Sequence, residues 1–167
     1  MVTVEFLGSS APPGTVSYVV IAARAEGGWT FVKHRERGGY EMPAGHPEAG
    51  EDTPAAAVRE LTEETGASGF TIEPVGYYSV DGYSGKKYGR LFYAEIDSFD
   101  SITDRDEIEW VRIFKRLPKH LSLPEVMSFL FRIANDYFTE NNQGPIFKKS
   151  TKNKISDSVR SVSTKRI

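Results

Sequence analysis

Hydrophobic residues along this chain form strand-like runs on both sides of one short amphipathic segment. Residues 16–24 are apolar and β-branched, and a Gly-rich turn separates them from a second such run at residues 29–34. Three more strand-like runs follow the amphipathic segment, separated by turns that contain Gly or Asp; they are residues 70–80, 88–96 and 107–114. Residues 81–85 have the composition of a hairpin connection. This order is compatible with a mixed sheet flanked by helices.

The amphipathic segment is predicted to be a helix of about three turns that begins near Pro54. Asp52 and Thr53 offer side-chain oxygens for an N-cap, and proline suits the first helical position. Gly66 can supply the left-handed residue that commonly ends a helix. The side chains expected to face the core are Pro54, Ala57, Val58, Leu61 and Thr65.

A second helix is predicted near the end of the apolar part of the chain. Ser122-x-x-Glu125 has the pattern of a capping box, with Ser122 as the N-cap. Apolar residues then follow at helical spacing: Val126, Phe129, Leu130, Ile133 and Tyr137.

The polar side of the first helix carries Glu60, Glu63 and Glu64 within an arc of about 100°. Like charges at these spacings cost roughly 0.2–0.5 kcal/mol per pair, and Glu51 in the preceding loop can add a fourth carboxylate. A hard divalent cation, Mg²⁺ or Mn²⁺, would offset this repulsion because it prefers oxygen ligands. Arg59 lies four residues before Glu63 and can pair with it. A merely solvated acidic face is the alternative, but it explains none of these spacings.

The same residues form one longer motif, Gly45-x5-Glu51-x7-Arg59-Glu60-Leu61-x-Glu63-Glu64-x-Gly66-Ala67. It resembles the signature box of the Nudix (MutT-like) pyrophosphohydrolases. The resemblance implies an α/β/α sandwich with a mixed sheet over residues 1–138. It also implies an enzyme that cuts a phosphoric anhydride bond in a nucleoside diphosphate-linked substrate by attack of water on phosphorus.

The resemblance further implies roles for the residues of the box. Glu60 either binds a metal ion or accepts the proton of the attacking water, and we assign it the role of general base. Glu63 and Glu64 would be metal ligands, Gly45 would offer its carbonyl, Glu51 would be an auxiliary ligand, and Arg59 would orient the carboxylates. An acid outside the box often completes such a site, and the candidates are Asp104, Asp106 and Glu107.

Substrate contacts are less defined by the sequence. Lys33 and Arg35 belong to a basic cluster with His34 and Arg37 that can bind phosphates or form a solvated loop. The stretch 34–43 is similar to the triphosphate-cleaning branch that includes 8-oxo-dGTP diphosphatases, although Ala44 also occurs in ADP-ribose-type members. Tyr83 stands where dinucleoside polyphosphate hydrolases have a tyrosine.

We therefore expect hydrolysis of (deoxy)nucleoside triphosphates such as oxidised dGTP to a nucleoside monophosphate and pyrophosphate. An ADP-ribose hydrolase, a dinucleoside polyphosphate hydrolase and a non-catalytic nucleotide-sensing module are the alternatives. The expected partner is the nucleotide substrate. A second copy of the chain is a further candidate partner, since family members often form homodimers.

The composition narrows the class of protein. A length of 167 residues suits one domain, and the lack of cysteine excludes disulfides, thiolate zinc sites and a thiol nucleophile. No signal peptide and no apolar run of membrane-spanning length is present, so we expect a soluble cytoplasmic protein with no membrane partner.

The net charge of −2 is unevenly distributed. Residues 139–167 contain seven basic and two acidic residues and lack apolar periodicity, so we expect a basic, poorly ordered tail. A nucleic-acid-binding arm, serving removal of RNA 5′-end pyrophosphate, is an alternative interpretation. Nucleic acid is not the partner that we expect.

Overall fold

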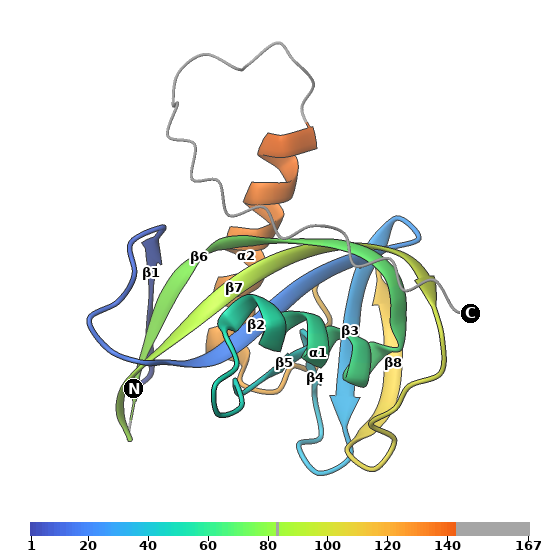
Figure 1. Ribbon diagram of the computed structural model, residues 1–167, viewed down its shortest axis with the longest axis horizontal. Coiled ribbons are helices and arrows are strands. Elements are labelled where there is room, and N and C mark those ends of the chain that lie inside the picture. The colour runs from blue at the N-terminus through green and yellow to red at the C-terminus, as the bar shows by residue number, and fades with distance from the viewer. Residues whose placement is uncertain (83, 143–167) are drawn as a thin grey trace.

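The computed structural model describes residues 1–82 and 84–142, which form one eight-stranded sheet and two helices (Figure 1). The elements in chain order are β1 (Thr3–Gly8), β2 (Val16–Ala25), β3 (Gly28–His34), β4 (Tyr40–Glu41), β5 (Ala44–Gly45), α1 (Thr53–Thr65), β6 (Ala67–Gly82), β7 (Gly85–Phe99), β8 (Ile108–Phe114) and α2 (Pro124–Asn142). All five strands predicted from the sequence are present. The strands β1, β4 and β5 were not predicted.

The sheet is mixed, as predicted. Its strand order is β1-β6-β7-β2-β3-β4, while β5 pairs with β2 and β8 pairs with β3. The β2–β7 pairing is parallel, and the other pairings of named strands are antiparallel. Pairing of β5 with β2 places Gly45 opposite Val19, so part of the turn-rich segment before α1 is anchored to the sheet.

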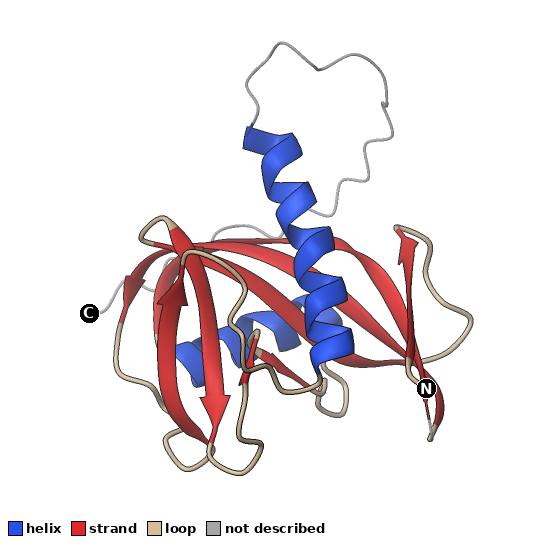
Figure 2. Ribbon diagram, turned by 180° about the vertical axis from the view of Figure 1, so that it is seen from behind, coloured by secondary structure: helices blue, strands red, loops and turns tan. Residues whose placement is uncertain are grey.

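The two helices cover opposite faces of the sheet, with α1 in front in Figure 1 and α2 in front in the reverse view of Figure 2. Along β2, Val19 and Ile21 pack in the core beneath α1, whereas Val20 and Ala22 pack in the core beneath α2. Because both faces of this strand are buried, its sequence is a continuous apolar run instead of an alternating one.

The first helix begins and ends as predicted. Asp52 is the N-cap and accepts a hydrogen bond from the Ala55 backbone N–H (2.8 Å). Gly66 adopts φ 76° at the C-terminus, and its N–H donates to the Thr62 carbonyl (2.9 Å). The buried residues of α1 are Ala56, Ala57, Leu61, Glu64 and Thr65. Glu64 is therefore a buried carboxylate and not part of a solvated acidic face.

The capping box predicted for the second helix is wrong. The helix starts at Pro124, and the Leu123 carbonyl accepts the hydrogen bond from the Met127 N–H (3.0 Å). The Ser122 hydroxyl instead donates to the Arg37 carbonyl (3.4 Å). Ser122 thus ties the loop before α2 to the loop after β3, and the helix begins one residue later than the capping box predicts.

Aromatic side chains hold α2 against the sheet. The Trp29 ring makes edge contacts with Phe131 and Phe138, at centroid distances of 5.1 and 5.8 Å. The Arg24 guanidinium lies 4.0 Å from the Phe138 ring centroid. The last turn of α2 includes residues 139–142, the first four residues of the expected tail. The rest of that tail and Tyr83 lie outside the described residues.

Neither helix of the described residues combines the length and the apolar character that are needed to cross a membrane.

Candidate active site

The acidic side of α1 faces the short strand β5. The Glu60 carboxylate lies against Gly45, with no room for a side chain between them. Burial raises the pKa of Glu60 to about 7; Arg59 opposes this rise, and the charges of Glu64 and Glu63 add to it. A side chain at position 45 would therefore displace the Glu60 carboxylate, which is the flexible end of its side chain.

Arg59 joins three carboxylates of the motif. Its Nε and Nη2 donate to the two oxygens of Glu51 (2.9 and 3.0 Å), and Nη1 donates to Glu60 Oε1 (2.8 Å) and Glu63 Oε2 (3.2 Å). Nη2 also donates to the His46 carbonyl (3.0 Å). The spacing predicted only the pair with Glu63. The structure shows that Arg59 also ties the loop before α1 to the helix.

Glu64 lies deeper than the other glutamates of the motif and is only 3% exposed. Its Oε2 accepts a hydrogen bond from the Ala44 N–H (3.0 Å), and its Oε1 lies 3.2 Å from His34 Nε2. Burial raises the pKa of Glu64, although His34 and the Ala44 N–H act in the opposite direction. Two donors from β3 and β5 thus hold a buried carboxylate.

Glu41 is a second buried acid, and the sequence analysis did not identify it. It is 2% exposed, and its Oε1 has no hydrogen-bond partner among the described residues. Its Oε2 lies 3.3 Å from Arg37 Nη1. Burial raises the pKa of Glu41, while Arg37 and His34 lower it. The sequence signal that could have indicated Glu41 is a charged residue next to the apolar Met42.

Two adjoining cavities open beside these groups. The first has a volume of about 260 Å³ and is lined by Tyr18, Arg37, Ala44, Gly45, His46, Glu48, Arg59, Glu60, Glu64, Asp104 and Glu107. The second, of about 250 Å³, is lined by His34, Arg35, Glu36, Arg37, Asp106 and Glu107. Five acidic residues and two arginines line the first cavity, so acidic groups outnumber basic ones.

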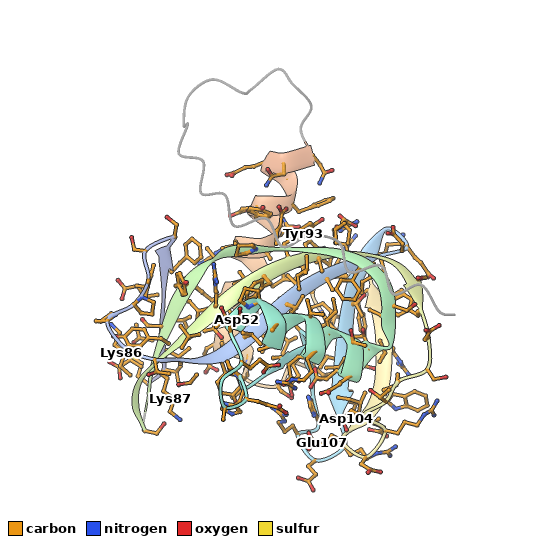
Figure 3. All side chains as sticks on the ribbon, viewed as in Figure 1. Asp52, Lys86, Lys87, Tyr93, Asp104 and Glu107 are labelled. Carbon is orange, nitrogen blue, oxygen red and sulfur yellow. The ribbon has the colours of Figure 1, made fainter. Side chains whose placement is uncertain are left out.

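The loop before β8 brings the distant acids to these cavities. The Asp104 N–H donates to the Glu63 carbonyl (3.1 Å), and the Arg35 N–H donates to the Glu107 carbonyl (2.9 Å). Asp104 and Glu107 lie close together on this loop in Figure 3. The loop is therefore fixed to both α1 and the end of β3.

The structure places only some of the residues expected to contact substrate beside the two cavities. Arg35 lines the second cavity and donates to the Arg105 carbonyl (3.2 Å). Lys33 lines neither of the two cavities and pairs with Glu109 (3.0 Å). Tyr18 was missed: it lines the first cavity, and its ring lies 4.0 Å from the ring of His46.

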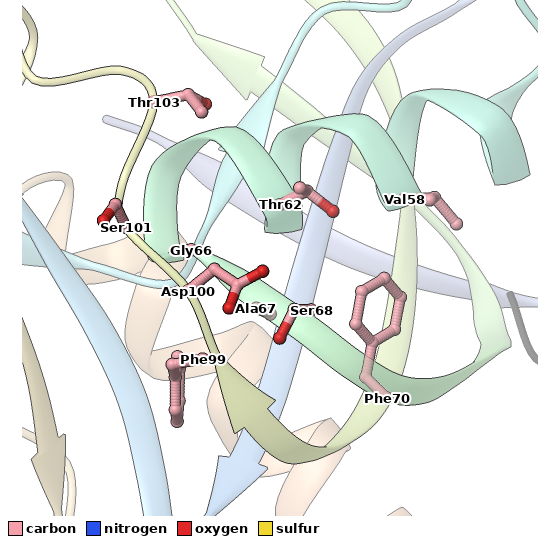
Figure 4. Close-up of a pocket in the computed structure, with 10 residues that line it drawn as sticks. All are labelled: Val58, Thr62, Gly66, Ala67, Ser68, Phe70, Phe99, Asp100, Ser101 and Thr103. Carbon is pink, nitrogen blue, oxygen red and sulfur yellow. The ribbon is translucent and has the colours of Figure 1, made fainter. Parts of the chain in front are cut away.

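A larger cavity of about 850 Å³ lies at the C-terminal end of α1, between the helix, β6 and the chain after β7 (Figure 4). Its lining includes Phe70, Asp100 and four hydroxyl side chains, but no lysine, arginine or histidine of the described residues. It contains none of the motif carboxylates. We therefore place the candidate active site at the smaller acidic cavity.

The donor set suits a hard cation, because the motif offers only oxygen atoms and the acidic cavity carries excess negative charge. Within the described residues, however, no three acidic or histidine side chains are arranged around one point as metal ligands. Glu51, Glu60 and Glu63 converge on the Arg59 guanidinium instead. The positive charge among these carboxylates is supplied by Arg59 in this structure.

The chain matches a known protein family over most of its length. The NUDIX domain family model matches residues 13–131, so the chain belongs to the Nudix family. It is thus a hydrolase of phosphoric anhydride bonds. Nudix enzymes bind nucleotide substrates and generally use divalent metal ions.

The Bacillus subtilis protein named "Putative 8-oxo-dGTP diphosphatase YtkD" is 32% identical over 115 residues, covering 69% of this chain and 72% of that protein. The crystal structure of the B. subtilis pyrophosphohydrolase BsRppH is similar with a TM-score of 0.68 and 25% identity, covering 81% of this chain and 90% of that one. A Caenorhabditis elegans Ap4A hydrolase shares the fold, with a TM-score of 0.54, 18% identity and coverage of 75% and 99%. The predicted Nudix sandwich is confirmed.

Proposed function

We propose that this protein is a metal-dependent pyrophosphohydrolase that cleaves (deoxy)nucleoside triphosphates, such as oxidised dGTP, to a nucleoside monophosphate and pyrophosphate. The observation that carries the proposal is the acidic cavity, where five acidic residues outnumber two arginines, beside a second cavity lined by Arg35 and Arg37. A polyphosphate can enter the acidic cavity only when cations offset the repulsion. The name of the B. subtilis relative at 32% identity supports the choice of substrate.

The residues that would hold Mg²⁺ or Mn²⁺ are Glu60, Glu63 and Glu64, with the Gly45 carbonyl and Glu51 as auxiliary ligands. When bound, such an ion would polarise the phosphoryl oxygens and lower the pKa of a water molecule. Arg59, which already contacts three of these carboxylates, would orient them.

Side chains of the protein itself accept the proton and bind the phosphate groups. Glu60 accepts the proton of the attacking water if it does not bind the ion, and Asp104 and Glu107 are the alternative bases because they line the same cavity. Arg35 and Arg37 bind the phosphate oxygens through their guanidinium donors.

The remaining substrate contacts are proposed from the sequence or from the cavity lining. Lys33 could join the phosphate contacts only by leaving Glu109. Tyr83 is kept as a candidate for stacking on the base. Tyr18 offers an aromatic surface in the cavity itself.

A panel of nucleotides, incubated with Mg²⁺ or with EDTA and followed by product identification, tests the function. We expect oxidised dGTP to give the monophosphate and pyrophosphate, and EDTA to abolish the reaction. Preferred cleavage of ADP-ribose, of a dinucleoside polyphosphate or of a 5′-triphosphate RNA would replace the proposed substrate class. Unchanged hydrolysis in EDTA would overturn the metal role, and tight binding without turnover would indicate a sensing module.

We also propose that the protein acts in the cytoplasm and that it forms a homodimer. Light scattering of the purified protein would test the dimer, and imaging of the protein in its native cells would test the location.

A further inference from the structure

His34 is a buried side chain that the proposed reaction does not use. It lies at the end of β3, is 4% exposed, and approaches Glu64 with its Nε2 atom 3.2 Å from Oε1. The other oxygen of Glu64 accepts the hydrogen bond from the Ala44 N–H (3.0 Å). Both carboxylate oxygens are therefore held, one by the backbone of β5 and one by a side chain of β3.

The partners of His34 define where its proton lies. An ionised carboxylate only accepts hydrogen bonds, so Nε2 carries the proton that faces Glu64 whenever Glu64 is ionised, as it would be as a metal ligand. Arg37 Nη2 lies 3.2 Å from Nδ1 and 3.3 Å from Nε2, and a guanidinium only donates. In the neutral ring Nδ1 is then the acceptor for Arg37. In the protonated ring Nε2 still donates to Glu64, so both protonation states present the same donor.

Arg37 and Glu41 hold His34 from the other side. Arg37 Nη1 lies 3.3 Å from Glu41 Oε2, and the Glu41 side chain is 2% exposed. The Arg37 side chain is 45% exposed and lines both cavities. A continuous set of contacts thus leads from the cavities through Arg37 and His34 to Glu64.

We propose that His34 is a positioning residue that fixes the Glu64 carboxylate for metal binding, and that Arg37 and Glu41 fix His34. This inference rests on the proposed role of Glu64 as a metal ligand. Hydrogen bonds to a ligand carboxylate restrict its orientation, so metal affinity depends on groups that never touch the metal. Loss of the His34 donor leaves one oxygen of Glu64 unrestrained and the other held by Ala44.

The test measures Mn²⁺ affinity by electron paramagnetic resonance on metal-free full-length protein, without nucleotide. We expect His34→Leu to weaken Mn²⁺ binding by about 10-fold or more. His34→Gln, whose amide can donate from nearly the place of Nε2, should recover most of the affinity. Thr30→Val is the matched control, since Thr30 is fully buried on the same strand and its hydroxyl has no partner among the described residues. It should bind Mn²⁺ like the wild type.

A ¹⁵N NMR measurement of the His34 ring in the metal-free wild type provides a readout that does not depend on any variant folding. We expect a proton on Nε2; a proton on Nδ1 alone would overturn the proposal. Wild-type affinity in a folded His34→Leu, or a His34→Gln variant as weak as His34→Leu, would overturn it too. Wild-type protein that takes up no Mn²⁺ would refute the proposed function itself, which separates the two failures.

Discussion

The Glu60 carboxylate rests directly on the backbone of Gly45, so that a Cβ added to Gly45 would overlap the Glu60 Cδ and Oε1 atoms. This contact joins the first residue of the motif to its central carboxylate. It exists because β5 is paired with β2, and α1 packs over these two strands.

Gly45→Ala should therefore displace Glu60. We expect kcat/KM to fall by about 10²-fold or more, because small misplacements of a catalytic group have effects of that size. Steady-state kinetics with the nucleotide triphosphate, together with thermal unfolding, would measure it. Gly82→Ala is the control, since its Cβ would meet only Val2 Cγ2 at 3.7 Å. Equal kinetics for the two variants would argue against the role of the Gly45–Glu60 contact.

Glu60→Gln should lower kcat by at least about 10²-fold while the fold is retained, because the shape is kept and the charge is lost. The measurement is kcat at saturating substrate and Mg²⁺, with a melting curve to confirm folding. Glu125→Gln, an exposed glutamate in the first turn of α2, should leave kcat unchanged. Full activity of Glu60→Gln would remove Glu60 from both the base and the ligand roles.

Arg59→Met should destabilise the protein, and metal should reverse part of the loss. Glu51, Glu60 and Glu63 lose their common cation in this variant, which we expect to cost about 1–3 kcal/mol of unfolding free energy. Thermal unfolding in EDTA and in Mn²⁺ would compare the two conditions. Mn²⁺ should reduce the difference from wild type if the ion and the guanidinium serve the same carboxylates. A loss of the same size in both conditions would show that the ion and the guanidinium do not serve the same carboxylates. Arg132→Met, on the exposed side of α2, is the control.

Removal of residues 143–167 should leave nucleotide hydrolysis unchanged, since α2 ends at Asn142 and the remaining sequence lacks apolar periodicity. A chain that ends at residue 137 should melt at a lower temperature, because it loses the Phe138 contacts with Trp29 and Arg24. Melting curves and kcat/KM of both truncations would place the domain boundary. A fall in RNA affinity and in its salt dependence after the shorter deletion would instead support a nucleic-acid role for the tail.

Features that depend on neighbouring residues could be predicted from the sequence, whereas features that depend on distant parts of the chain could not. The limits of α1 followed from Asp52, Pro54 and Gly66, because caps and breakers act within one turn of the residues that they affect. The capping box at Ser122 failed because a contact with Arg37, 85 positions away, determines where that hydroxyl points. Strand β5 was missed because two residues carry no periodicity and pair only where β2 offers them a partner.

By itself, the sequence determined the secondary structure of the longer elements, the placement of three glutamates and an arginine on one side of α1, and the family resemblance. Those features depend on spacing along one helix or strand, which the order of residues specifies directly. Tertiary structure alone decided that Glu64 is buried against His34, that Glu41 lies beside Arg37, and that the loop of Asp104 and Glu107 reaches the motif. The contact of His34 with Glu64 and the approach of the Asp104–Glu107 loop join segments far apart in the chain, so they form only when the sheet and α1 pack together. Arg37 and Glu41 are four positions apart, but their pairing depends on how the chain folds between β3 and β4.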